Sequence, residues 1–279
     1  MADVAEAFVW ACSLDVAARK PGNVSLASAG HRMQAQQFIA SARAAAPAIA
    51  AAGQPVGARI ELAMRATLAA VGCNTNLGIV LLCAPLAVAA ESAVPPGAKG
   101  LRRALQQVLD TLDLADAQAA FRAIALTQPA GLGQVAQQDV HAPPSVTLRA
   151  AMALAAGRDS VARQYDEGYA DLFDRALGWF GGVVGPPEQA LQRVFLEALV
   201  RWPDSHIVRK HGEAAAHTVM QEALPWCDRA RAGLSMDADP TWAAWDESLK
   251  ARGLNPGTSA DLCVATAFLH GLLHMHMCR

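Results

Sequence analysis

Aromatic side chains are scarce in this chain of 279 residues, where they make up 5% of the composition and include only two tyrosines. Alternating runs of Val, Ile, Thr and aromatic residues, which are typical of β-strands, are hard to find. Alanine is abundant instead, within a composition that is 53% hydrophobic. Because alanine is small and favours helices, we expect an all-α protein whose helices approach one another closely.

An excess of charge and long apolar runs are also lacking. The formal net charge is -2, which predicts no general electrostatic attraction to nucleic acid or to an anionic membrane. The longest apolar run, from Leu77 to Ala90, contains Gly78 and Pro85 and is short for a membrane span, so we expect a buried core helix. The first residues lack a basic region followed by an apolar segment, so no signal peptide is expected.

Signature motifs of several protein classes are missing. The six cysteines form no CxxC pair and mostly lie in apolar runs, so we expect buried, reduced thiols in a cytoplasmic protein. No GxGxxG, P-loop or HExxH sequence is present. His270 and His274 have i,i+4 spacing and His276 follows, but a packed last helix is favoured over a metal site because no carboxylate ligand is evident.

Glycine and proline breaks divide the chain into helical segments. We expect helices at 4–19, 34–52, 59–71, 77–90, 99–112, 115–125, 146–156, 159–179 and 188–201, and two more that begin near Asp204 and Asn255. The loop at 131–144, which contains Asp139 and His141, is the predicted mobile segment. Because polar motifs lie on both sides of it, we predict a single domain over residues 1–279, a bundle of about a dozen helices.

The stretch from Lys20 to Ser25 has the features of a phosphate clamp. Pro21 ends the first helix, Gly22 allows close approach of the backbone, and Lys20 supplies a point charge. Asn23 adds a neutral polar group. Taken alone, the stretch is more typical of a helix-ending turn with a surface lysine.

Three further polar stretches stand at helix breaks, and each also has a structural interpretation as a helix cap or a solvated face. They are Asn74-Thr75-Asn76-Leu77-Gly78, Asp204-Ser205-His206 leading into Arg209-Lys210-His211-Gly212, and Asn255-Pro256-Gly257-Thr258-Ser259-Ala260-Asp261. Together with Lys20 to Ser25, and in this order, they resemble the triphosphoribosyl-dephospho-CoA synthase family. These enzymes prepare the prosthetic-group precursor of citrate lyase and malonate decarboxylase. The resemblance extends from about Asp15 to Leu269.

The resemblance implies a pentosyltransferase-like enzyme that moves the 5-triphosphoribosyl group of ATP to the ribose hydroxyl of 3'-dephospho-CoA and releases adenine. Such chemistry requires cations and Mg²⁺ for the triphosphate, a carboxylate near ribose C1, and a base for the hydroxyl proton. The citrate-type relatives carry Thr-His-Lys-Gly where this chain has Leu77 before Gly78. One expected cation is therefore absent, and the acceptor is left open.

Site roles follow from the resemblance together with the local patterns. We expect phosphate or nucleotide contacts from Lys20, Arg163, Arg209, Lys210, Asn255 and Ser259, and positioning by Asn23, Asn74 and Asn76. Asp166, Asp204 and Asp261 are the expected Mg²⁺ ligands or C1-stabilising carboxylates, and His31 and His206 the acid–base groups. Asp159, Arg163 and Asp166 share one helix face, which fits either a Mg²⁺ or ribose-phosphate site or a surface salt-bridge ladder. We expect Lys20 to be partly exposed, and Lys20, Asn76, Asp204 and Asp261 to converge.

Two other functions remain compatible with the sequence. One is a related phosphoribosyl-type transferase with another acceptor, such as a pterin-cofactor intermediate. The other is a non-catalytic helical protein that binds nucleotides or acts as a scaffold. The sequence leaves the oligomeric state open, and a homodimer is compatible with it.

Overall fold

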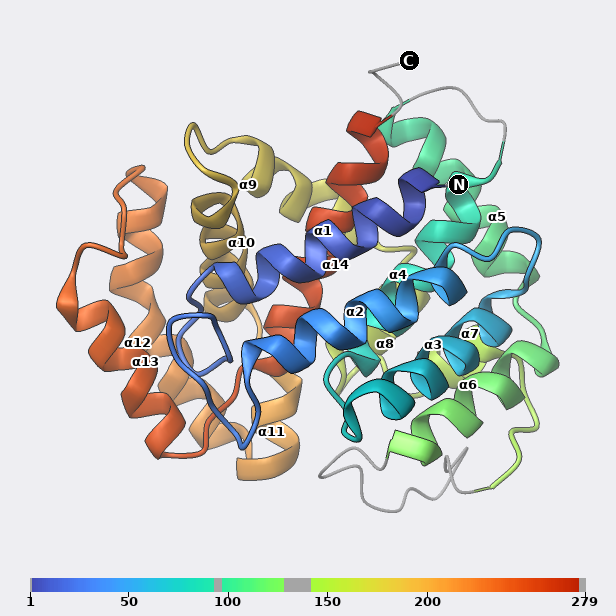
Figure 1. The fold of residues 1–279 in the computed structure, drawn as a ribbon, viewed down its shortest axis with the longest axis horizontal. Coiled ribbons are helices and arrows are strands. Elements are labelled where there is room, and N and C mark those ends of the chain that lie inside the picture. Colours follow the sequence, from blue (N-terminus) through green and yellow to red (C-terminus); the bar gives the residue numbers. More distant parts are fainter. Residues whose placement is uncertain (1, 93–96, 128–141, 276–279) are drawn as a thin grey trace.

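The computed structural model describes residues 2–92, 97–127 and 142–275, and within these ranges the secondary structure is helical (Figure 1). The elements are α1 (Ala2–Ala17), α2 (Ala35–Ile49), α3 (Val56–Val71), α4 (Leu77–Ala90), α5 (Ala98–Thr111), α6 (Leu114–Thr127), α7 (Leu148–Ala153), α8 (Ser160–Asp166), the π-helix η1 (Leu172–Ala176), α9 (Leu177–Gly181), α10 (Pro187–Arg201), α11 (Ser205–His211), α12 (Glu213–Arg231), α13 (Pro240–Ala251) and α14 (Gly257–Met275). The predicted all-α fold is confirmed.

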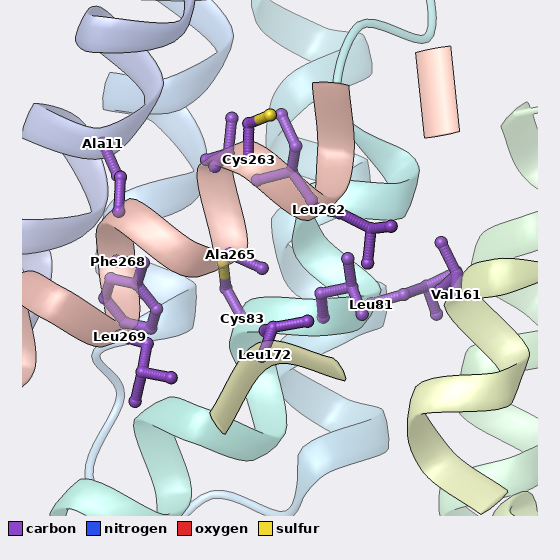
Figure 2. Close-up of a cluster of buried hydrophobic side chains, with 14 of the residues drawn as sticks. Ala11, Leu81, Cys83, Val161, Leu172, Leu262, Cys263, Ala265, Phe268 and Leu269 are labelled. Carbon is purple, nitrogen blue, oxygen red and sulfur yellow. The ribbon is translucent and has the colours of Figure 1, made fainter. Parts of the chain in front are cut away.

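The centre of the molecule is formed by α4 and α14, with α1 lying beside α14 (Figure 1). The apolar run at 77–90 is a core helix, as predicted, with buried residues around its whole circumference. One main cluster of buried apolar side chains extends from Ala7 in α1 to Leu272 in α14. Many of its members are alanines, which allow helices to pack closely. Figure 2 shows part of this cluster, with Ala11, Leu81, Val161, Leu172 and Phe268 among the labelled side chains.

The predicted long helix at 159–179 is wrong, because the chain breaks after α8. Gly168 and Tyr169 have φ angles of 62° and 57°, in the left-handed region that a continuous helix excludes. The break puts both tyrosines against α4, where the Tyr165 hydroxyl donates to the carbonyl of Leu81 at 2.6 Å and the Tyr169 hydroxyl donates to that of Leu82 at 3.1 Å. The Leu81 carbonyl needs this donor because Pro85, four residues on, has no N–H.

Several smaller expectations can be compared with the described residues. Cys12, Cys83, Cys227 and Cys263 are buried free thiols, as predicted, whereas Cys73 is only partly buried. Burial raises the pKa of the Cys12 and Cys83 thiols. None of the described helices is long and apolar enough to cross a membrane. Asp139, His141, His276 and most of the loop predicted to be mobile lie outside the described residues.

Candidate active site at a junction of helix ends

The N-terminal ends of α4, α8, α11 and α14 meet at one place in the fold. The backbone N–H of Ser160, at the start of α8, donates to the Ser205 hydroxyl at the start of α11, at 2.9 Å. The N–H of Ser259, in the first turn of α14, donates to Asp204 at 2.7 Å. Asp261 of α14 lies against Gly78 in the first turn of α4. Three of the four motifs found in the sequence are therefore neighbours in space.

Asp204 is a structural link within this junction. Its Oδ1 accepts from the N–H groups of His206 and Ile207 at 2.9 and 3.1 Å and so caps α11, as the sequence predicted. Its Oδ2 accepts from the N–H and the hydroxyl of Ser259 at 2.7 and 2.8 Å. Burial raises the pKa of Asp204, and these donors counteract part of that rise. Four donors use the acceptor capacity of a carboxylate, so the predicted metal and catalytic roles do not fit Asp204.

Asp261, unlike Asp204, has a carboxylate whose oxygens are not used by hydrogen-bond donors of the described chain. No hydrogen bond to its carboxylate is found among the described residues, and its Oδ2 occupies the space that a side chain at position 78 would need: a Cβ built on Gly78 would lie 2.0 Å from that oxygen. Burial, with the neighbouring carboxylates of Asp15 and Asp204, raises the pKa of Asp261 well above its usual range. A carboxyl group in such surroundings favours a nearby cation. The absence of a side chain on Gly78 leaves the space that the Asp261 carboxyl group occupies.

Lys20 differs from its predicted state. Its side chain is 0% exposed, and Nζ lies 3.0 Å from Oδ1 of Asp15, with a further hydrogen bond to the Asp15 backbone carbonyl. The expectation of a partly exposed lysine is therefore wrong. Asp15 is also buried, so the ammonium group neutralises a carboxylate inside the protein and is not presented at the surface.

The loop after Lys20 is joined to the segment that precedes α14. The Asn23 side-chain amide donates to Oδ1 of Asn255 at 3.0 Å, while Oδ1 of Asn23 is buried without a hydrogen-bond partner. Gly22 has φ of 81°, and a Cβ there would lie 2.6 Å from the Leu254 carbonyl oxygen. Glycine is required at this close contact. The first and fourth motifs are thus also brought together.

The basic helix α11 supplies most of the polar side chains of the junction. His206 packs beside Gly257, its Nε2 is buried without a partner, and burial together with Arg209 and Lys210 lowers its pKa to about 4. Arg209 forms an ion pair with Asp159, the N-cap of α8, at 2.6 Å, and its Nε is buried without a partner. Lys210 is exposed.

The second motif stands at the start of α4. The side-chain Oδ1 of Asn74 accepts from the N–H of Leu77 at 3.1 Å. Asn76 is buried; its Oδ1 accepts from the Thr67 hydroxyl at 3.1 Å, and its Nδ2 has no hydrogen-bond partner. Asn76 comes two residues before Gly78, so this unused donor lies at the same helix end as Asp261.

Asp166 and Arg163 are not part of this arrangement. Asp166 is exposed at the C-terminal end of α8. Arg163 pairs with Asp171 at 3.1 Å and stacks on Trp202, with 4.8 Å from its guanidinium carbon to the ring centre. The predicted shared face of Asp159, Arg163 and Asp166 does not form as a site, because Asp159 pairs with Arg209, Arg163 pairs with Asp171, and Asp166 is exposed.

The oxygen atoms of this junction can be compared with the ligands that Mg²⁺ requires. Among the described residues, no group of three or more His, Cys, Asp or Glu side chains could hold a metal ion. Of the three predicted ligands, Asp204 is saturated and Asp166 lies elsewhere, which leaves Asp261. Mg²⁺ commonly takes one or two carboxylates and completes its coordination with waters and substrate phosphates. Asp261 fits that requirement, provided that phosphate oxygens are present.

Sequence reasoning missed the roles of Gly78 and Asp246. Gly78 follows the expected lysine position, but nothing in its spacing predicts that it makes room for Asp261. Asp246 lies on α13 and accepts from the N–H of Gly22 at 2.9 Å across 224 positions of sequence. A contact at that separation leaves no local pattern. Asp159 caps α8 and is also the ion-pair partner of Arg209, a contact that no local pattern indicates.

The fold and this junction define an all-helical protein in which polar groups from four helix N-termini meet. The model of the ATP:dephospho-CoA triphosphoribosyl transferase family (CitG) matches residues 1–278, and the chain belongs to this family. The predicted family, enzyme class and transferase function are therefore confirmed. No curated protein matches the chain. A crystal structure assigned as a triphosphoribosyl-dephospho-CoA synthase from Archaeoglobus fulgidus matches with a TM-score of 0.64 and 23% identity, over 85% of this chain and 98% of that one. At this identity it shows that the fold is shared.

Proposed function

We propose that the helix-end junction binds the triphosphate of ATP and transfers the triphosphoribosyl group to dephospho-CoA. One observation carries this assignment. Four buried polar atoms without a partner come from the segments that meet here: Oδ1 of Asn23, Nδ2 of Asn76, Nε2 of His206 and Nε of Arg209. Each such atom costs about 1–3 kcal/mol when nothing pairs with it. A ligand that carries both donors and anionic oxygens removes that cost.

The cationic groups of the junction favour phosphate oxygens, whereas its carboxylates favour a cation between them and the triphosphate. Arg209 and Lys210 are cationic, and the N-terminal ends of α4 and α14 point amide groups and the positive ends of their helix dipoles toward it. Leu77 stands where the lysine of the citrate-type relatives is expected. Arg209 and Lys210 therefore take a larger share of the phosphate contacts in this chain.

The transfer breaks the glycosidic bond between ribose C1 and adenine, and adenine leaves with the bonding electron pair and takes up one proton, which balances the proton lost by the acceptor hydroxyl. The oxygen of the acceptor hydroxyl then bonds to C1, and its proton passes to a base. Asp261 is the carboxylate with unused oxygens, so it is assigned to stabilise positive charge at C1. His31 is assigned as the base, because it lies near enough to His206 to contribute to the lowered pKa of that residue and its Nδ1 has no partner in the described chain. His206 is assigned to contact the triphosphate.

Mg²⁺, when bound, would be held by Asp261 together with phosphate oxygens, and it would neutralise part of the triphosphate charge.

The buried free thiols fit a reducing compartment, so we assign the enzyme to the cytoplasm.

The test of ATP binding uses the pKa of His206, which lies near 4 without ligand. A bound triphosphate favours the charged imidazolium, so the pKa of His206 should rise toward its ordinary value of about 6.5. NMR titration of the histidine ring signals, with and without ATP, measures this change; His206→Asn identifies the signal.

Adenosine is the matched control, because it lacks phosphate and should leave the His206 titration unchanged. Arg209→Gln should weaken ATP binding by about tenfold or more, since a hydrogen bond to a charged group contributes about 1.5–3 kcal/mol. Saturating ATP that leaves the titration of His206 in place would show that the triphosphate binds elsewhere.

A further inference from the structure

The loop between α1 and α2 contains a tight turn with an unusual composition. Gly30 and Met33 exchange two backbone hydrogen bonds, at 3.1 and 2.8 Å, around His31 and Arg32. Both central residues have positive φ, 53° and 64°. Turns of this type normally use Asn and Gly, because residues with larger side chains adopt positive φ only at a cost in free energy. Surrounding contacts must therefore hold His31 in place.

The first of these contacts fixes the proton on the imidazole ring. Nε2 of His31 lies 2.8 Å from the backbone carbonyl oxygen of Gly22. A carbonyl only accepts hydrogen bonds, so Nε2 carries the proton and Nδ1 carries the lone pair. Nδ1 has no partner in the part of the chain that the structure describes. The Gly22 peptide therefore sets both the orientation of the ring and the nitrogen that can accept a proton.

The Gly22 peptide is in turn held by a buried carboxylate. Oδ1 of Asp246 accepts from the N–H of Gly22 at 2.9 Å, and the Asp246 side chain is 0% exposed. Its Oδ2 lies 2.9 Å from Nζ of Lys250. The same Nζ donates to the Ser28 carbonyl at 3.2 Å. The Asp246–Lys250 pair on α13 thus holds the loop at two points before the His31 turn, at Gly22 and at Ser28.

We propose that Asp246 is a positioning residue for His31, acting through the Gly22 peptide. The inference rests on the proposed role of His31 as the base. Burial of a carboxylate is costly, and both oxygens of Asp246 are directed at this loop or at the lysine that also binds it. The contact chain runs from Asp246 to Gly22 to His31, and it ends at the free Nδ1.

The first test measures the tautomer of His31 by correlation of its ring ¹⁵N and ¹H signals, assigned with His31→Gln. The wild-type protein should show the Nε2–H form. Asp246→Ala should show a mixture of the two tautomers, because Gly22 loses its anchor. If the alanine variant does not fold, Asp246→Asn replaces it: its amide oxygen can still accept from Gly22, so the Nε2–H form should persist, and a mixture of tautomers in that variant would contradict the proposal. This readout needs no turnover, so it stands even if the proposed reaction is wrong.

The second test separates positioning from stability in the adenine-release assay. Asp246→Ala should lower kcat by about 10- to 100-fold, with a smaller change in KM for ATP. Asp246→Asn should recover part of kcat, because its amide oxygen can still accept from Gly22. The control is Glu222→Gln, which removes one charge of the 2.7 Å ion pair between α12 and Arg252 at the end of α13 but does not touch the loop. A His31 tautomer unchanged in Asp246→Ala, with a loss of kcat no greater than in the control, would overturn the proposal.

Discussion

At the scale of single residues, the buried pair of Asp15 and Lys20 shows how a motif residue can have a structural role. Burial raises the pKa of Asp15, and the nearby Lys20 ammonium counteracts that rise. Removing one member of a buried pair leaves the other charge without compensation, which is costly. Breaking the pair would therefore destabilise the end of α1, from which the loop to His31 begins.

Lys20→Met should lower the free energy of unfolding by about 3–5 kcal/mol. The measurement is urea unfolding, with Lys99→Met as the control, because Lys99 is exposed. The double variant Lys20→Met/Asp15→Asn should regain part of the loss. A variant that keeps its stability but no longer binds ATP would restore the phosphate-clamp interpretation of Lys20.

Some residue roles could be predicted from the sequence and others could not. Asp159 and Asp204 precede short helices, and their capping follows from that position alone. The second oxygen of Asp204 binds Ser259, 55 positions away, which no local pattern reveals. For the same reason the sequence could not separate the saturated Asp204 from Asp261, whose oxygens have no such donors.

At the scale of helices, many boundaries follow from glycine and proline, but α12 and α13 were not expected as separate helices, and the long helix expected at 159–179 is wrong. That segment has helical composition, but Gly168 and Tyr169 leave the helix so that both tyrosines reach the carbonyls of α4. A long-range demand for hydrogen-bond donors thus overrides local propensity. The polar ends of α4 and α14 were predictable as helix starts, whereas their contact through Gly78 and Asp261 required the fold.

Gly78→Ala tests the contact between α4 and α14. Alanine normally stabilises a helix relative to glycine, by about 1 kcal/mol. Here the added Cβ would lie 2.0 Å from Oδ2 of Asp261, so the carboxylate must move. We expect at least a tenfold loss of kcat in the adenine-release assay, with only a small change in stability, on the order of 1 kcal/mol.

Gly178→Ala is the matched control for that variant, because a Cβ on Gly178 would meet nothing within 4 Å. It should keep full activity. If Gly78→Ala were as active as Gly178→Ala, the position of Asp261 would not matter for the reaction.

At the scale of the whole molecule, segments from both ends of the chain meet at one junction. The loop after α1 contacts the start of α14 through Asn23 and Asn255, and α14 contacts α11 through Ser259 and Asp204. The order of the four motifs predicted the family, and the position of each motif at a helix break predicted their convergence. Their shared location depends on the central packing of α4 and α14 (Figure 1).

The central claim is that this junction carries out the transfer, and adenine release from ATP in the presence of dephospho-CoA tests it most directly. The wild-type protein should form adenine and triphosphoribosyl-dephospho-CoA in equal amounts. Asp261→Asn should lower the rate by about 100-fold or more with an unchanged melting temperature, because its carboxylate is assigned to charge stabilisation at C1. Asp166→Asn, at an exposed carboxylate outside the junction, should remain active. Full activity in Asp261→Asn, or adenine released equally well without any acceptor, would contradict the account.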